Sequence, residues 1–548
     1  MHCTSHMGKR LLLLLLSIGC CLAGFAAESY TLRGRVIDRL TRRPVAYAAV
    51  VLDGQGDKGA STDSTGRFAI ERVRPGIYRL APSCIGYRNT LTPEYVVSAA
   101  TPFIEIELVE DAAQLDAVTV TPTPFRRTAE SPVGLQVIGL REIEKSPGAN
   151  RDVSRIVRSY PGVSFSPVGY RNDLIVRGGG PSENVFYMDG IEIPNINHFA
   201  TQGASGGPVS IANADLVREI SFYTGAFPAD RAGALSSVLD FRLRDGDPEK
   251  HSFKATLGAS EVSLSGNGPL SERTTYLFSV RQSYLQLLFK MLGLPFLPNY
   301  IDAQIKIKSK LSARDELTVL GLTGIDNMRL NTDEKGEEAE YLLSYLPRIR
   351  QETFTVGAVY RHYAGQHTQS VSLSHNYLNN RNLKYRDNDA SSDENLMLRL
   401  RSVEQKTTLR GENRSWLGRW TLTEGAELNY RRYTNRTLQR LYGAACRRLR
   451  LLGADAAVLA AAFAAPVAGL CARRRMVGQG QRRHLPPAAA PDGVRTARQR
   501  RRVGQPQPAL HAGEGPERGD RLAAARPADR LDRRIPQRLR PHPAGGGD

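Results

Sequence analysis

Between His251 and Gly443 the sequence repeatedly alternates apolar and polar residues. From Ala303 to Leu311 every second residue is apolar or small, and the residues between them are one glutamine and three lysines. Successive side chains of a β-strand point to opposite faces, so this period of two predicts strands with one apolar and one polar face. Soluble β-sandwiches and outer-membrane barrels both use such strands. The alternation therefore predicts antiparallel β-structure here, without deciding between these two classes.

The first 26 residues have the pattern of a secretory signal peptide. The pair Lys9-Arg10 precedes an apolar run from Leu11 to Cys21, and Gly24-Phe25-Ala26 has the small-x-small form of a cleavage site. The run is too short to span a bilayer as a helix. Cys20 leaves lipidation open as an alternative, although Ser17 stands where a lipobox has leucine. We expect export by a cleaved signal peptide.

The net charge of +19 does not predict a nucleic-acid partner, because it is unevenly distributed. The last 105 residues carry 21 Arg, no Lys and 8 acidic residues, which amounts to +13. The pair Lys9-Arg10 adds +2, which leaves +4 for residues 27–443. That is an ordinary surface charge rather than the basic footprint of a nucleic-acid-binding protein.

The composition changes abruptly after Gly443. Residues 444–548 contain 23 Ala and 21 Arg but no Ser, Lys, Asn, Tyr or Trp, and the alternation stops. Such a mixture is typical of a GC-rich coding region read in the wrong frame. The alternative is a selected basic tail for nucleic acid or membrane. We expect an out-of-frame, disordered tail.

The stretch from Leu174 to Pro194 reads LIVRGGGPSENVFYMDGIEIP. Two short apolar runs flank a glycine-rich turn, and the second run ends in a further turn at Asp189-Gly190. A helical spacing at Arg151 to Tyr160 and a Pro-Gly-Val precede it. An apolar segment at Asp215 to Phe222, with a glycine turn behind it, follows. These elements, in this order, define a compact unit ahead of the alternating region.

This order of elements resembles the plug domain of TonB-dependent outer-membrane receptors. The chain departs from the family at Arg231-Ala232, where the family usually has Tyr-Gly. A plugged receptor of 22 strands needs about 450 barrel residues. Residues 245–443 supply 199, in which we place eight strands, so we expect a barrel truncated by a frameshift. The resemblance rests on the signature residues Arg177, Gly178, Asp189, Gly190, Glu219 and Gly225.

Two further segments fit this family. Residues 30–110 show short β-type runs between Gly, Pro, Asp and Asn turns, with a turn at Asp63 to Phe68 and another at Arg74 to Tyr78. They resemble the carboxypeptidase regulatory-like domain, a seven-stranded β-sandwich ahead of many Bacteroidetes receptors. Extended, β-branched residues bounded by proline could add as a strand to a partner's sheet. The resemblance places a TonB box in that segment, at Leu115, Asp116, Ala117, Val118, Thr119, Val120 and Thr121.

The sequence contains few signs of catalytic chemistry. No HExxH motif occurs, so the regulatory-like domain brings no zinc peptidase with it. Gly178-Gly179-Gly180 lacks the Gly-Lys-Ser/Thr of a phosphate loop and is interpreted as a tight turn. We therefore expect no enzyme activity, no cofactor and no metal.

Two groups of plug residues are candidate site residues. Arg177 is expected to form buried ion pairs with Asp189 or Glu219 that hold the plug together. Polar, glycine-rich loops on a rigid scaffold are where binding residues usually lie. Candidate ligand-contacting residues in these loops are Ser182, Glu183, Asn184, Asn195, Asn197 and His198.

The sequence thus predicts a mostly β protein with an N-terminal β-sandwich, an α+β plug, a partial antiparallel transmembrane barrel and a disordered tail. The resemblance implies active uptake of a solute across the Gram-negative outer membrane. It also implies TonB, outer-membrane lipid and a small or oligomeric solute as partners, with a surface lipoprotein as a further possibility. The alternative is a surface adhesin or interaction protein built from β-domains. The expected domains are a signal peptide (1–26), the regulatory-like domain (27–110), a linker with the TonB box (111–130), the plug (131–247), the partial barrel (248–443) and the tail (444–548).

Overall fold

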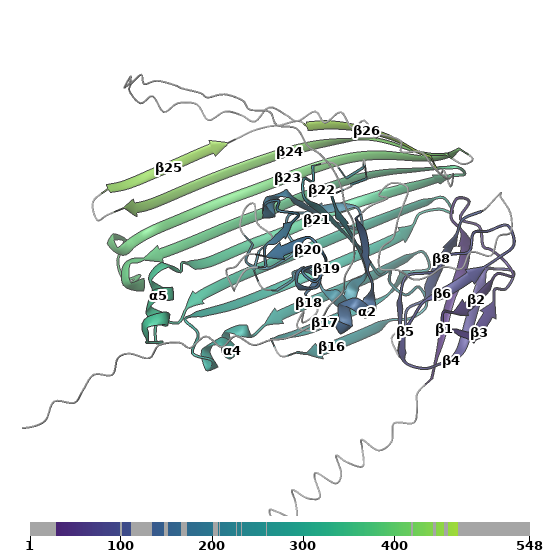
Figure 1. Ribbon diagram of the computed structural model, residues 1–548, viewed down its shortest axis with the longest axis horizontal. Helices are drawn as coiled ribbons and strands as arrows, with labels where there is room; N and C mark the ends of the chain where they lie inside the picture. Colours follow the sequence, from purple (N-terminus) through teal and green to yellow (C-terminus); the bar gives the residue numbers. More distant parts are fainter. Residues whose placement is uncertain are drawn as a thin grey trace, which may run out of the picture. The chain divides into compact units, whose positions relative to one another are not determined.

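The structure of the protein is a computed structural model (Figure 1). The strands and helices of the part of the chain that the structure describes lie between Tyr30 and Ala468. The expected signal peptide and TonB box lie outside the described residues. The structure describes residues 29–98, 101–110, 134–146, 152–165, 172–200, 206–207, 209–225, 227–228, 230–231, 233–258, 260–417 and 420–441, and the backbone of strands at 445–453 and 459–468.

The N-terminal β-domain has sheets in the orders β4-β1-β8, β3-β2-β6 and β5-β7. Buried positions alternate along β1 and β4, so one face of each strand packs into a core that includes Leu32, Val36 and Ile70. The family resemblance implies seven strands, and the described residues form eight short ones. They are β1 (Tyr30–Asp38), β2 (Ala49–Leu52), β3 (Gln55–Ser61), β4 (Arg67–Val73), β5 (Gly76–Tyr78), β6 (Leu80–Ser83), β7 (Tyr95–Val97) and β8 (Ile104–Leu108).

The plug is built on a five-stranded sheet in the order β13-β12-β15-β14-β9, with β10 and β11 paired separately. The helix predicted at Arg151 to Tyr160 is present as the short α3, where the Asp152 side chain caps the helix by accepting from the Ser154 N–H. Its elements are β9 (Leu135–Ile138), α2 (Leu140–Lys145), α3 (Val153–Val157), β10 (Val163–Phe165), β11 (Leu174–Val176), η1 (Pro181–Glu183), β12 (Asn184–Met188), β13 (Ile191–Ile193), η2 (Ala214–Leu216), β14 (Val217–Thr224) and β15 (Ser237–Leu243).

The alternating region forms one antiparallel sheet in which consecutive strands are neighbours from β16 to β25 (Figure 1). We call this the barrel sheet. It has nine strands up to Leu441, one more than predicted. They are β16 (Ser252–Leu257), β17 (Glu261–Ser271), β18 (Thr274–Ser283), β19 (Phe296–Lys310), β20 (Asp315–Leu330), β21 (Arg348–Ala364), β22 (His367–Tyr385), β23 (Leu396–Leu417) and β24 (Trp420–Leu441).

The connections of the barrel sheet differ at its two ends. At the short-turn end, β21 and β22 are joined by two residues between Ala364 and His367. At the long-loop end, the connections carry helices or 3₁₀ turns. In single-chain outer-membrane barrels the short turns are periplasmic and the longer loops extracellular. The long-loop elements are α4 (Leu285–Met291), α5 (Glu337–Tyr345), η3 (Arg386–Asn388) and η4 (Asp393–Asn395).

The expectation of a disordered tail needs correction at two segments. Strands β25 (Ala445–Gly453) and β26 (Leu459–Ala468) both pair with β24. The edge of a long strand offers unpaired N–H and C=O groups, and main-chain pairing demands little of the sequence that joins it. Residues from 469 onward lie outside the described part of the chain.

The two faces of the barrel sheet differ as the alternation predicts. Along β20 the even-numbered residues from Glu316 to Asp326 are buried, whereas outward residues such as Ile325 are exposed. Inward Leu320, Leu322 and Val359 join the apolar core of the plug. Within the described residues, no helix has the length and hydrophobicity needed to cross a membrane.

Candidate functional site: the plug and its contacts with the barrel sheet

The plug signature contains two tight turns. Asp189 and Gly190 have φ of 49° and 89°, and Met188 pairs with Ile191 across them. This is a two-residue hairpin loop with two left-handed residues, which explains the Asp-Gly sequence because Asp tolerates this conformation and Gly adopts it freely. Arg177 and Gly178 also have positive φ, of 51° and 78°. The signature thus encodes backbone conformation.

The predicted ion pairs of Arg177 are absent from the described structure, so that prediction is wrong. Arg177 lies near Thr224, with Nη2 3.5 Å from its hydroxyl. Asp189 and Glu219 lie at the other end of the plug sheet. There Asp189 pairs with Lys306 of β19 at 2.9 Å, and Glu219 pairs with Arg242 at 3.2 Å. The length of the sheet strands therefore keeps Arg177 apart from Asp189 and Glu219.

His198 connects the plug to two strands of the barrel sheet. Its Nδ1 lies 2.6 Å from Oδ1 of Asp326 on β20, and its Nε2 lies 3.1 Å from Oδ2 of Asp302 on β19. The His198 side chain is fully buried. The ring stacks on Tyr300 with the centroids 4.0 Å apart. Because both ring nitrogens face carboxylates, the geometry fits an imidazolium that donates on both sides.

The charges around His198 account for its pKa. Burial alone would lower the pKa, but attraction to Asp326 and hydrogen bonds with Asp302 and Asp326 raise it from 6.5 to about 9. Asp326 also accepts from the Phe199 N–H at 2.6 Å. His198 therefore carries a positive charge at neutral pH, held between two carboxylates of the strands.

Arg281 of β18 extends this network to a second part of the plug. Its Nε donates to Asp302 at 3.0 Å. Its Nη2 donates to the carbonyl oxygens of Ser210 and Ile211 at 2.8 and 3.0 Å. Asp302 therefore contacts His198 directly and is linked through Arg281 to the plug segment at Ser210 and Ile211. We call His198, Arg281, Asp302 and Asp326 the histidine anchor.

Further polar contacts fix the plug along the sheet. Glu192 pairs with Lys406 of β23, and its carbonyl accepts from Asn376 of β22 at 3.0 Å. Asn213 donates to Ser279 of β18 at 2.6 Å. The plug is therefore bonded to β22 and β23 as well as to the strands of the histidine anchor.

A second charged cluster lies inside the plug. Arg231 donates to Asp230 at 2.9 Å and to Asp240 of β15 at 2.7 Å, and its guanidinium lies over the Tyr187 ring, 4.8 Å from the centroid. Burial opposes its charge, but Asp240 and Asp230 hold the pKa of Arg231 well above its usual value. Arg410 of β23 approaches Asp230 at 3.5 Å. Arg231 is one of the two residues at which the sequence departs from the plug family. Here it pairs with Asp230 and Asp240 inside the plug.

The structure assigns structural contacts to most of the proposed ligand-contacting residues. Asn195, Asn197 and His198 are buried. Glu183 accepts from the Ser236 hydroxyl at 2.5 Å, and Asn184 is buried and donates to the Leu174 carbonyl at 2.8 Å. Contact of these residues with a solute stays a prediction. With the plug in the position seen here, a solute cannot reach Asn195, Asn197 or His198, because their side chains are buried.

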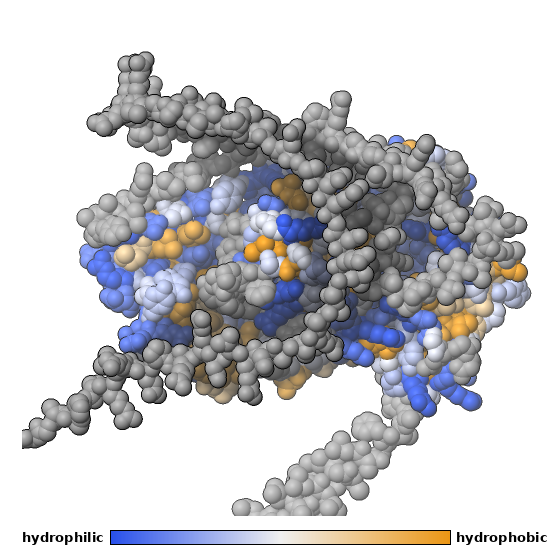
Figure 2. Space-filling model, in the orientation of Figure 1, coloured by the Kyte–Doolittle hydropathy of each residue, from blue (hydrophilic) through white to orange (hydrophobic). Residues whose placement is uncertain are grey.

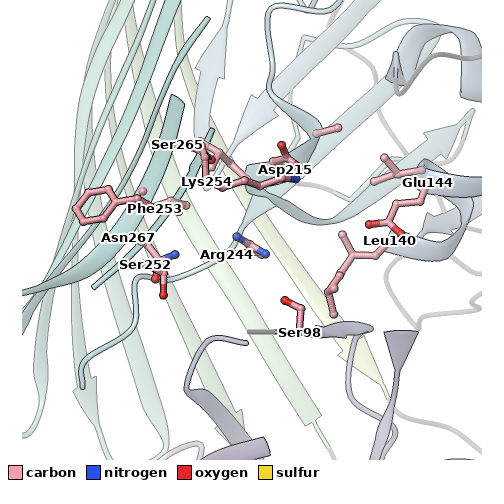
Figure 3. Close-up of a pocket in the computed structure, with 16 residues that line it drawn as sticks. Ser98, Leu140, Glu144, Asp215, Arg244, Ser252, Phe253, Lys254, Ser265 and Asn267 are labelled. Atoms are coloured by element: carbon pink, nitrogen blue, oxygen red, sulfur yellow. Dashed lines mark hydrogen bonds and ion pairs between the residues drawn. The ribbon is translucent and has the colours of Figure 1, made fainter. Parts of the chain in front are cut away.

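Ser182 is the exposed member of the proposed set. It lines a pocket whose barrel-sheet side contains Asn376, Glu404, Lys406 and Arg431. A second cavity, of about 320 Å³, lies beside η2 and the edge strand β16 (Figure 3). There Lys254 pairs with Asp215 at 2.9 Å. Charged side chains line both spaces.

The side of the molecule that carries the plug mixes hydrophobic and hydrophilic residues (Figure 2). Among the described residues, no group of three or more His, Cys, Asp or Glu side chains is placed to hold a metal ion.

Two family comparisons match this architecture. Residues 32–120 match the CarboxypepD_reg-like domain, and residues 127–236 match the TonB-dependent Receptor Plug Domain. The chain carries the plug domain of a TonB-dependent receptor. The plug match covers all six signature residues, and the barrel sheet follows it in the chain.

Solved structures of outer-membrane receptors are similar to this chain at low identity. The ferric enterobactin receptor PfeA of Pseudomonas aeruginosa is 19% identical, with 56% of this chain and 50% of that chain covered and a TM-score of 0.42. The siderophore receptor PirA from Acinetobacter baumannii is 14% identical, with coverage of 56% and 49% and a TM-score of 0.41. The copper transporter OprC is 12% identical, with coverage of 59% and 50% and a TM-score of 0.43.

The chain spans about half the length of these solved structures. No curated protein matches its sequence.

The sequence did not reveal Asp302, Asp326, Arg281 or Arg231 as functional residues. The first three occupy inward positions of strands, where alternation predicts a polar residue without distinguishing a charge that anchors the plug. Cross-strand register would have been the necessary signal, since it places Arg281 opposite Asp302.

Proposed function

We propose that this chain serves TonB-dependent active uptake of a solute across the outer membrane. The observation that supports it most is a plug domain bonded by buried charges to the inward face of alternating strands. The outward face of the same strands exposes apolar side chains such as Phe354, Leu373 and Leu409, as lipid contact requires. The plug occupies the position in which it would close a lumen, and no part of the proposal requires catalysis.

The handle for opening this gate is the expected TonB box at Leu115 to Thr121. It lies ahead of β9, which is one of the two edge strands of the plug sheet. A partner that added a strand there would pull first on β9, whose register with β14 comprises four residue pairs. Strand addition uses main-chain bonds and needs little sequence specificity.

Binding of TonB tests the proposal directly. Isothermal titration of the purified chain with the C-terminal domain of TonB is expected to show binding that Val118→Pro weakens at least about tenfold, because proline removes a main-chain donor. Ala129→Pro, in the same linker but outside the box, is the matched control and should bind like the unaltered chain. No binding by the unaltered chain would favour the surface adhesin.

We also propose that the barrel was interrupted by a frameshift near Gly443. The break in composition at that residue supports it, and so does the strand count, which is below half of 22 at Leu441. Reading the nucleotide sequence beyond the Gly443 codon in the other two frames should give further alternating strands in one of them. Stop codons and no alternation in both frames would refute the frameshift.

The remaining parts of the proposal concern export, the type of receptor, its partner and its solute. The signal sequence supports export, and the regulatory-like domain ahead of the plug supports a receptor of Bacteroidetes type, for which a surface lipoprotein is a natural partner. The solute class is left open, because the loops that select it would lie largely on strands beyond β24. A small solute and an oligomeric one both fit a plugged barrel.

A further inference from the structure

Four arginines form one cross-strand row on β21 to β24. Arg350 pairs with Arg381, Arg381 with Arg401, and Arg401 with Arg436. With neighbouring strands about 4.8 Å apart, the row spans about 14 Å. We call these four residues the arginine row.

The arginine row lies on the outward face of the barrel sheet. Side chains two residues apart share a face, so Arg350 lies on the same face as Phe354 and Val356, both of which are exposed. The same parity joins Arg401 to the exposed Leu409. The row is therefore directed away from the plug, toward the surroundings of the sheet.

The same-face row next to the arginines is mixed, and an apolar belt begins farther toward the short-turn end. Four residues from Arg350 toward the short-turn end, Phe354 stacks on Tyr377 with centroids 5.0 Å apart. Two rows beyond them, the cross-strand row is wholly aliphatic. It contains Val319, Ala358, Leu373, Leu409 and Leu428. The arginine row thus lies on the long-loop side of this belt, four same-face rows from its aliphatic row, and in a membrane that is the side of the outer headgroups.

The protein neutralises this row incompletely. Glu352 lies 3.3 Å from Nε of Arg350 and 3.8 Å from Nη2 of Arg381, and Asn379 holds its carboxylate at 3.0 Å. Among the described residues, neither Arg401 nor Arg436 has a carboxylate partner. Like charges directly opposite each other on neighbouring strands are destabilising. A row with one carboxylate for four guanidinium groups therefore calls for an anion from outside the chain.

We propose that the arginine row binds the phosphate groups of a phosphorylated lipid in the outer leaflet. Guanidinium groups donate bidentate hydrogen bonds to phosphate oxygens, and arginine is well suited to such planar recognition. The belt below the row would contact the acyl chains of the same lipid. The inference rests on the membrane placement in the proposed function, but not on coupling to TonB or on the solute.

Lipid binding by the full chain tests this inference. The chain in neutral detergent micelles is titrated with diphosphorylated lipid A and with the same lipid after enzymatic removal of its phosphates, and bound lipid is counted by native mass spectrometry. The unaltered chain should bind the phosphorylated form at least about tenfold more tightly. Replacing all four arginines by Gln should remove this preference. The matched control replaces four exposed arginines of the N-terminal β-domain by Gln, namely Arg33, Arg43, Arg67 and Arg74.

A second variant and a competition with inorganic phosphate complete the test. If the fourfold variant does not fold, the pair Arg401→Gln and Arg436→Gln is used, because neither residue has a described carboxylate partner to lose. Excess inorganic phosphate should leave lipid binding largely intact; complete displacement would identify a free-anion site and overturn the proposal. Equal binding by variant and control would overturn it as well. Loss of TonB binding leaves this measurement unaffected, so the two proposals fail separately.

Discussion

Replacing His198 by glutamine is expected to weaken the attachment of the plug to the barrel sheet by about 3–5 kcal/mol, because it leaves the buried carboxylates of Asp302 and Asp326 without their shared cation. Glutamine approximates the size of the ring but carries no charge. Hydrogen exchange followed by mass spectrometry on the plug peptide around His198 measures this as the free energy of local opening. His251→Gln is the control, since the exposed His251 contacts only the Tyr276 hydroxyl, at 3.0 Å, among its described hydrogen-bond partners.

The histidine anchor also predicts a pH dependence with a defined sign. The folded pKa of His198 is raised from 6.5 to about 9. Its contribution is therefore fully present below pH 6.5 and is lost as the pH rises through about 9. The shift corresponds to about 3 kcal/mol. After correction for intrinsic exchange rates, the opening free energy of this peptide should fall between pH 6.5 and 9 in the unaltered chain.

The same profile should be flat in the His198→Gln variant. A double variant, which adds Asp326→Asn, should recover part of the lost free energy, because the amide removes the charge left without His198 while Asp302 keeps its pair with Arg281. An unaltered chain that shows no pH dependence in this range would contradict the anchor.

Replacing Arg231 by methionine is expected to destabilise the plug by about 3–5 kcal/mol. Methionine keeps the aliphatic contact with Tyr187 but leaves Asp230 and Asp240 together in a site where each side chain is only 10% exposed. Hydrogen exchange of the peptides that contain β12 and β15 reports the change. Arg242→Met on β15 is the matched control, because Arg242 is 55% exposed and its pair with Glu219 should contribute no more than about 1 kcal/mol.

A double-mutant cycle separates charge from packing at this site. Adding Asp240→Asn to Arg231→Met should restore stability by about 1–3 kcal/mol, since the two residues are in contact and their effects are not additive. If Arg231→Met and Arg242→Met have equal, small effects, the cluster does not stabilise the plug and the description above is incorrect.

The extent to which the sequence predicted the fold differs between elements. Strand alternation located the barrel sheet, because the side-chain period of a strand is a local property. The helix at 151–160 was predicted, but it is only five residues long. Strands β25 and β26 were missed, because their pairing comes from the free edge of β24 rather than from their own composition.

The candidate site was predicted less well. The signature turns at Arg177-Gly178 and Asp189-Gly190 were identified because left-handed backbone restricts the choice of residue locally. The partners of Asp189 and Glu219 were not, since a charge pair depends on which strands become neighbours. Lys306 is 117 positions from Asp189, and nothing in either local sequence connects them.

The sequence by itself determined the order of parts: a regulatory-like domain, a plug with its turn signature, and strands that have an apolar face. These follow from composition, periodicity and turn chemistry, which act over a few residues. Only the tertiary structure decided that His198 is an anchor between two strands instead of a solute contact, and that four arginines meet on one outward row. Both depend on strand register, which the whole sheet sets and which brings distant residues to within a few ångströms.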